Sequence, residues 1–108
     1  MAQNFRRYTS SGVGTSAVTI HTANSYDTII GISLANTATT SINVDVYIND
    51  GVSDIYLIKS APIVQGSTMQ LLEGGAKYVI QSGDALKVVS DTASSCDVWV
   101  SAVDDISS

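Results

Sequence analysis

Residues 42–48 alternate strictly between apolar side chains and others, and such alternation is the feature that most limits how this chain can fold. A period of two places Ile42, Val44, Val46 and Ile48 on one face of a β-strand. Similar short apolar segments, separated by Gly, Asn, Asp and Ser, recur along the chain, and none of them has a helical period. The pattern therefore predicts a fold built from strands.

Turn residues divide the chain into segments of strand length. Asn49, Asp50 and Gly51 follow the clearest strand and indicate a hairpin. Many short strands without helices predict an all-β fold: a single-domain antiparallel β-sandwich, of jelly-roll or immunoglobulin-like type, with roughly eight short strands. Strands are expected over residues 16–22, 26–35, 42–48, 54–60, 67–72, 77–81, 85–90 and 96–103.

The stretch over residues 61–90 contains the only proline, Pro62, and three glycine-containing turns. Pro62 lacks an N–H donor and belongs at a strand end or a sheet edge. We interpret the stretch as a β-meander whose closely spaced hairpins set the strand register. The turns are expected at residues 65–66, 73–75 and 82–84.

The apolar strand over residues 26–35 is expected to be central. In a regular strand, Ile30, Ile32 and Leu34 share one face and Ile29 lies on the other. The last expected strand, over residues 96–103, places Trp99 on the face opposite to an apolar row. Trp99 is then either an outward interface anchor or, if the faces are displaced by one residue, part of the core. The inward row of this last strand is Cys96, Val98, Val100 and Ala102.

The N-terminal residues 1–14 are expected to form an arm, with residues 15–108 as the β-sandwich domain. Phe5, Arg6, Arg7 and Tyr8 form either an edge strand anchored by Phe5 or an arm that orders against a neighbour. Two arginines on an acidic domain could reach an acidic surface of another subunit, or could simply be solvated. We predict that these four residues contribute to a protein interface.

Three tyrosines, Tyr47, Tyr56 and Tyr78, lie on strands that the predicted hairpins bring close together. Exposed aromatic rings on a sandwich could stack on sugar rings. Tyrosines more often rim a sheet or cover a subunit contact. Tyr47, Tyr56 and Trp99 are therefore added to the predicted protein interface.

Charge and composition restrict the partners. The chain of 108 residues has a formal net charge of −5, with five basic residues against ten carboxylates, which disfavours nucleic-acid binding. Only 14% of the residues are charged. A low content of charged residues suits a protein that contacts other protein over much of its surface.

Compartment signals are few. A single cysteine, Cys96, cannot form an internal disulfide, which fits synthesis in a reducing cytoplasm. The polar start MAQNFRR lacks the apolar core of a signal peptide, and no segment has the roughly 20 apolar residues of a membrane-spanning helix. We expect a protein without membrane attachment or a visible export signal.

Catalytic chemistry is not indicated. The one histidine, His21, lies in an alternating segment and is expected to be a polar outward residue. No GxSxG motif, DxDxDG loop or metal-ligand spacing occurs. We therefore expect no enzyme activity, no cofactor and no metal.

Several segments resemble small structural proteins of tailed-phage particles. API at residues 61–63 and STMQLLEGGAKYVIQSGDALKVVSDTASSCDVWVS at residues 67–101 resemble the C-terminal half of these proteins. RRYTS at 6–10, VGTS at 13–16 and IIGISLAN at 29–36 resemble the first half. The resemblance implies a non-enzymatic particle component, present in repeated copies and located in the virion.

The expected function is that of a capsid decoration, or cement, protein that binds across capsid subunits and stabilises the shell. Its partners are then the major capsid protein or other virion subunits, and it is expected to be a homo-oligomer. A neck, tail or fibre component, or a carbohydrate-binding adhesion module, remains an alternative.

Overall fold

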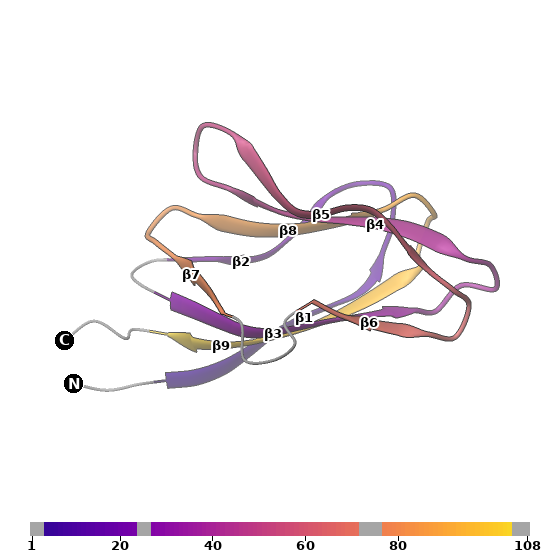
Figure 1. Ribbon diagram of the computed structural model, residues 1–108, viewed down its shortest axis with the longest axis horizontal. Coiled ribbons are helices and arrows are strands. Elements are labelled where there is room, and N and C mark those ends of the chain that lie inside the picture. Colours follow the sequence, from indigo (N-terminus) through magenta and orange to yellow (C-terminus); the bar gives the residue numbers. More distant parts are fainter. Residues whose placement is uncertain (1–3, 24–26, 72–76, 105–108) are drawn as a thin grey trace.

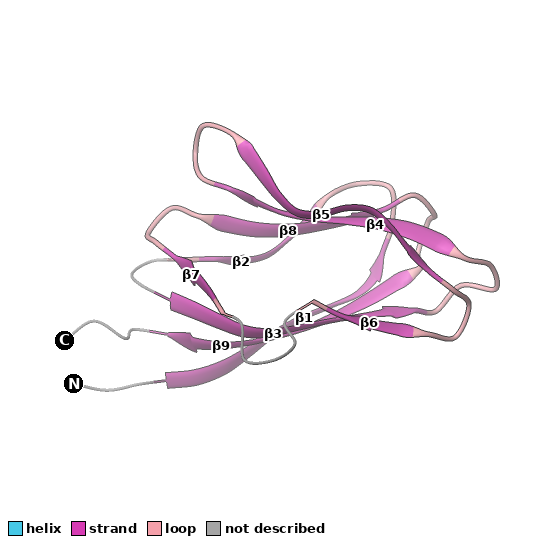
Figure 2. Cartoon of the chain, in the orientation of Figure 1, coloured by secondary structure: helices cyan, strands magenta, loops and turns pink. Residues whose placement is uncertain are grey.

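The computed structural model describes residues 4–23, 27–71 and 77–104, and these residues form nine β-strands and no helix (Figures 1 and 2). The predicted all-β fold is therefore confirmed. The strands are β1 (Asn4–Val13), β2 (Val18–Thr22), β3 (Asp27–Asn36), β4 (Ile42–Asn49), β5 (Asp54–Ile63), β6 (Thr68–Gln70), β7 (Tyr78–Ile80), β8 (Ala85–Ser90) and β9 (Cys96–Asp104).

The strands form two antiparallel sheets that pack face to face (Figure 1). The first sheet has the order β1-β9-β3-β6, with β7 also paired to β3, and the second has the order β2-β8-β4-β5. First and last strands pair, as do β2 with β8, β3 with β6 and β7, and β4 with β5. This nested pairing is the arrangement of a jelly roll, one of the two sandwich types expected from the sequence.

The core lies between the two sheets and is almost entirely aliphatic. The predicted inward rows of β4 and β9 are confirmed, because Val44, Val46, Cys96 and Val100 are fully buried. Side chains of both sheets thus alternate between the core and solvent, as is usual in sandwiches. The largest buried aliphatic side chains are Ile29, Ile32, Leu34, Ile42, Ile80 and Leu86.

Strand β3 departs from the regular alternation that the sequence suggested. Ile29 pairs with Ala102 of β9, and Gly31 pairs with the adjacent Ser101. Two residues of β3 thus correspond to one step along β9, so Ile30 is the extra residue of a β-bulge. The bulge turns both Ile29 and Ile32 into the core and leaves Ile30 exposed. The predicted shared face of Ile30 with Ile32 is therefore wrong, although β3 is the central strand that was expected.

The predicted meander over residues 61–90 is also wrong. Strands β6 and β7 both pair with β3, and β8 pairs with β2 and β4, so no two successive strands from β5 to β8 pair with each other. The chain instead crosses from the second sheet to the first and back. The turn expected at residues 73–75 lies outside the described residues, whereas the hairpin predicted at residues 49–51 joins β4 to β5. Strand β5 continues through Pro62, which is tolerated because β5 is an edge strand.

The N-terminal segment takes the edge-strand form rather than the form of a separate arm. Residues 4–13 make up β1, which pairs with β9 at the edge of the first sheet. Eight residues of β1 have partners in β9, and this pairing holds the segment in the sandwich. The division of the chain into residues 1–14 and 15–108 stays a prediction.

Cys96 gives a direct test of this core. Burial, with a smaller effect of the Asp97 charge, raises the pKa of the Cys96 thiol to about 11. Because the thiolate is the reactive species, a shift of about two units lowers its population near pH 8 about 100-fold. We expect a disulfide reagent to label native protein at least about 100-fold more slowly than unfolded protein.

The labelling rate of Cys96 should change with pH in a definite direction. Folding disfavours the thiolate, so the labelling rate of native protein should keep rising as the pH increases from 9 towards about 11. Labelling in guanidinium chloride, where the chain is unfolded, should level off near the ordinary thiol value and serves as the control. Immediate labelling of native protein at pH 8 would contradict burial of Cys96.

Candidate interaction surfaces

Trp99 projects from β9 onto the outer face of the first sheet. Its neighbours Val98 and Val100 point into the core, so the pleat directs the indole outward. The side chain is 52% exposed. Of the two alternatives drawn from the sequence, the exposed aromatic is the one observed. Large exposed aromatic side chains are frequent anchors of protein contacts.

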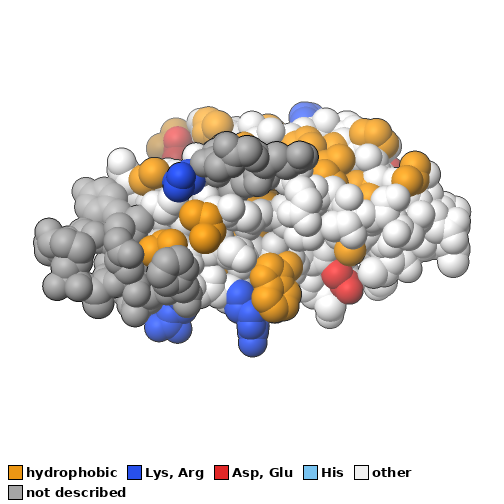
Figure 3. Space-filling view, turned by 60° about the horizontal axis from the view of Figure 1, so that its bottom comes forward, with side chains coloured by type: hydrophobic (Ala, Val, Ile, Leu, Met, Phe, Trp, Pro, Cys, Tyr) orange, Lys and Arg blue, Asp and Glu red, His pale blue; other side chains and the backbone are white. Residues whose placement is uncertain are grey.

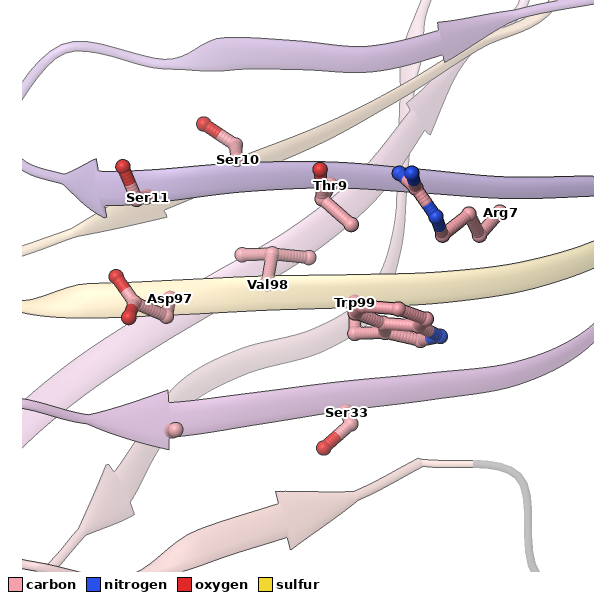
Figure 4. A pocket seen from close by; sticks show the side chains of 9 residues that line it. Arg7, Thr9, Ser10, Ser11, Ser33, Asp97, Val98 and Trp99 are labelled. Atoms are coloured by element: carbon pink, nitrogen blue, oxygen red, sulfur yellow. The ribbon is translucent and has the colours of Figure 1, made fainter.

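A shallow groove of about 710 Å³ surrounds this tryptophan (Figure 4). Arg7 and Thr9 of β1 lie on one side of Trp99, and Ser33 of β3 lies on the other. Short hydroxyl side chains leave the indole accessible and supply hydrogen-bonding groups around it. We call this surface the Trp99 groove; its lining includes Arg7, Thr9, Ser11, Ser33, Asp97 and Trp99.

Arg7 is placed beside the tryptophan by strand pairing. Arg7 is opposite Ser101 and Thr9 is opposite Trp99 in the β1–β9 register, so their side chains share the outer face. The guanidinium carbon of Arg7 lies 5.5 Å from the centre of the indole ring, a cation–π contact worth about 0.5–1 kcal/mol when exposed. Within the described part of the chain, no carboxylate lies at ion-pair distance from Arg7.

Asp97 at the end of the groove has a structural role. Its Oδ1 accepts a hydrogen bond of 2.9 Å from the backbone N–H of Gly12, where the β1–β9 register shifts. Gly12 has a φ of +66°, which favours glycine. Figure 3 shows this side of the molecule with hydrophobic side chains scattered among polar ones. A contact here therefore depends on a few anchors rather than on a broad apolar patch.

A second surface lies on the outer face of the other sheet. The rings of Tyr47 and Tyr56 pack with centres 5.0 Å apart, and Lys59 Nζ lies 4.3 Å from the centre of the Tyr56 ring. Tyr47 is on this face but only 8% exposed, whereas Tyr56 is exposed. Tyr78 is in β7 of the first sheet, so the predicted grouping of three tyrosines is wrong.

His21 does not point outward, contrary to the prediction. Thr19 is opposite Lys87 and His21 is opposite Leu86, so Ile20 is an extra residue that turns His21 to the inner face. His21 Nε2 lies 2.7 Å from Oδ2 of the fully buried Asp27. This pair was not predicted from the sequence. The one available signal was Asp27, a carboxylate at the start of the strand that follows His21.

The predicted interface residues of β1 lie in different environments. The Tyr8 ring stacks on His21 at 3.9 Å and packs against the core, so Tyr8 is partly buried. Arg6 is exposed but lies opposite the inward Ala102, on the other side of β1 from Arg7. The side chain of Phe5 lies outside the described residues. The structure thus brings Arg7 and Trp99 together on one face and Tyr47 and Tyr56 together on the other.

The described residues contain no group of three or more His, Cys, Asp or Glu side chains placed to hold a metal ion. Over the same residues, no helix is long and apolar enough to span a membrane.

Comparisons with known proteins identify the fold. No protein-family model matches the chain, and no curated protein sequence matches it significantly. A crystal structure of a pentameric capsid protein isolated from metagenomic phage sequences is similar with a TM-score of 0.55 and 14% identity, covering 94% of this chain. This chain spans 60% of the length of that capsid protein.

A second similar structure comes from Bacillus endospore appendages, which form a family of disulfide-linked pili. It has a TM-score of 0.53 and 12% identity, covering 94% of this chain and 84% of that one. The fold therefore resembles that of a phage capsid protein and that of a pilus protein.

Proposed function

We propose that this protein is a non-enzymatic structural subunit of a phage particle and that it assembles through the Trp99 groove. The observation that carries the proposal is the exposed indole of Trp99 on the outer face of a jelly-roll sheet, held beside Arg7, which has no carboxylate at ion-pair distance among the described residues. Aromatic and arginine side chains are the residues enriched at binding hot spots. The fold likeness to a phage capsid protein supports a place in the virion.

Within the particle, we propose the role of a capsid decoration, or cement, protein that binds across major capsid subunits and stabilises the shell. A subunit that binds the assembled shell but not its dissociated parts stabilises the shell by mass action. A homo-oligomer would bridge several capsid subunits at once, which raises its effective concentration at each contact. A neck, tail or fibre location is the alternative, and the likeness to a pilus protein is compatible with it.

The experiment is a binding assay on particles that lack this protein. Purified chain added to such particles should appear as regular cryo-electron microscopy density over the capsid. Trp99→Ala should lower occupancy at a fixed protein concentration by about tenfold or more, because a buried aromatic anchor contributes about 2 kcal/mol or more. The matched control is Val79→Ala, which changes an exposed apolar residue of the same sheet outside the groove.

Two results would contradict the proposal. Density restricted to the tail would exclude the decoration role, and equal occupancy of Trp99→Ala and Val79→Ala would show that assembly does not depend on the groove. Both variants should stay folded with a cooperative unfolding transition, since neither changed side chain lies in the core.

Sugar binding is a second candidate, favoured by the accessible indole and the surrounding hydroxyl groups of Thr9 and Ser33. Trp99 is the only tryptophan, so its fluorescence reports on the groove without interference. A glycan array with no binding, together with unchanged fluorescence on addition of host-surface polysaccharide, would remove this candidate.

A further inference from the structure

The turn between β4 and β5 projects from the second sheet, on the side away from the first sheet (Figure 1). Val52 lies in this turn and is 91% exposed. Two exposed carboxylates, those of Asp50 and Asp54, flank it in the sequence. The turn thus presents one apolar side chain between two acidic residues, and we call residues 50–54 the acidic tip.

Hydrogen bonds within the hairpin hold the acidic tip in a defined shape. Oδ1 of Asp50 accepts from the backbone N–H groups of Val52 and Ser53, at 3.0 and 2.8 Å. Asn49 accepts from the N–H of Gly51 at 2.9 Å and donates to Oδ1 of Asp54 at 2.7 Å. The turn has therefore already lost its conformational entropy in the single subunit. Such preorganisation favours binding by the acidic tip.

The end of the Trp99 groove that holds Arg7 is complementary to the acidic tip in chemistry, whereas Asp97 lies at the other end (Figure 4). The Arg7 end offers an exposed aromatic face, where a valine side chain can pack, and the guanidinium of Arg7, which lacks a carboxylate partner in the described part of the chain. Asp54 is the better partner for this cation. Oδ1 of Asp50 accepts two backbone hydrogen bonds that hold the turn, whereas Asp54 accepts one side-chain hydrogen bond, so engaging Asp54 disturbs the shape of the tip less.

The two surfaces cannot meet within one subunit. The groove lies on the outer face of the first sheet, and the acidic tip joins two strands of the second sheet. Contact therefore requires two molecules. The net charge of −5 does not prevent it, because opposite charges meet locally at this contact.

We propose that the Trp99 groove binds the acidic tip of a second copy of this chain, with Val52 packed on Trp99 and Asp54 paired with Arg7. The inference rests on the proposed assembly role of the groove and names its partner. The contact joins two different surfaces, so it leaves one groove and one tip unused in each pair. Repetition then builds a closed ring or an open row of subunits.

Charge exchange between the two surfaces tests the contact. In sedimentation velocity over a range of protein concentrations, the parent should associate. Arg7→Asp and Asp54→Arg should each weaken association about tenfold or more, and the double variant should regain association to within a few-fold of the parent. Arg6→Asp is the matched control: it makes the same charge change on the same strand, outside the groove, and should leave association unchanged.

A cysteine pair provides a second measurement that does not depend on the charge variants folding. Val52→Cys with Thr9→Cys should give disulfide-linked oligomers on oxidation, since Cys96 is buried and contributes no reactive thiol. Monomeric parent protein at all concentrations, a double charge variant as weak as the single ones, or absence of the cross-link would each overturn the inference.

The outcomes separate this inference from the proposed function. If Arg7→Asp abolishes capsid binding while parent and variant self-associate equally, the groove binds a capsid subunit instead and the inference fails alone. If charge exchange restores self-association but the protein does not bind particles, the contact stands and the proposed function fails.

Discussion

Replacing His21 with alanine is expected to lower the free energy of unfolding by about 2–4 kcal/mol. The change removes an imidazole nitrogen that lies 2.7 Å from the carboxylate of the fully buried Asp27. Removing one member of a buried polar pair takes a hydrogen-bond partner from the other in a medium of low polarity, which costs more than losing a pair in water. The imidazole also stacks on Tyr8, so His21 links β1, β2 and β3 across both sheets.

Denaturant unfolding at neutral pH, followed by circular dichroism, measures this loss. The control is Lys59→Ala, which removes an exposed ion pair with Asp45 at 3.8 Å and the contact of Lys59 with the Tyr56 ring. That change should cost about 1 kcal/mol. If His21→Ala and Lys59→Ala have equal effects, the His21–Asp27 contact does not stabilise the fold as described.

The fold class followed from local patterns in the sequence. The inward row of β9 and the hairpin at residues 49–51 depend on neighbours along the chain, and both were predicted correctly. Alternation reports whether a strand has a buried face, and turn residues report where the chain reverses. Neither signal depends on which distant strand is the partner.

Bulges and strand partners could not be predicted in this way. An extra residue at Ile20 inverts His21, and another at Ile30 turns Ile29 inward, because the side-chain period in a strand is two. The pairing of β6 and β7 with β3 likewise depends on contacts between residues far apart in the chain. The short spacing between strands suggested that successive strands pair as a meander. Nested pairing is favoured instead, because it lets both sheets bury one face in a common core.

The candidate site was predicted in its components but not in its arrangement. Arg7 and Trp99 were both expected at an interface, on separate grounds. Their contact arises from the pairing of the first strand with the last, which brings residues 92 positions apart in the sequence (99 − 7) into contact. The acidic tip was seen as a turn alone, since the sequence does not show that Val52 is left uncovered.

Asn36→Ala is expected to destabilise the protein by about 2–4 kcal/mol. Asn36 is 4% exposed, and its side chain donates to the carbonyls of Thr40 and Ile63, at 2.9 and 2.8 Å, and accepts from the N–H of Ala38 at 2.8 Å. Each such bond contributes about 1 kcal/mol net, and a buried carbonyl left without its donor costs more.

The matched control for this change is Asn43→Ala. Asn43 contacts Asp91 through its backbone N–H and carbonyl, at 3.1 and 3.0 Å, so alanine preserves both hydrogen bonds and the exposed side chain should contribute less than about 0.5 kcal/mol. Urea unfolding of both variants decides the outcome. Because Asn36 ties the end of β3 to the end of β5, a large effect confined to Asn36→Ala would show that one buried amide holds the two sheets together at this end. Equal, small effects would instead mean that aliphatic packing alone fixes the sandwich.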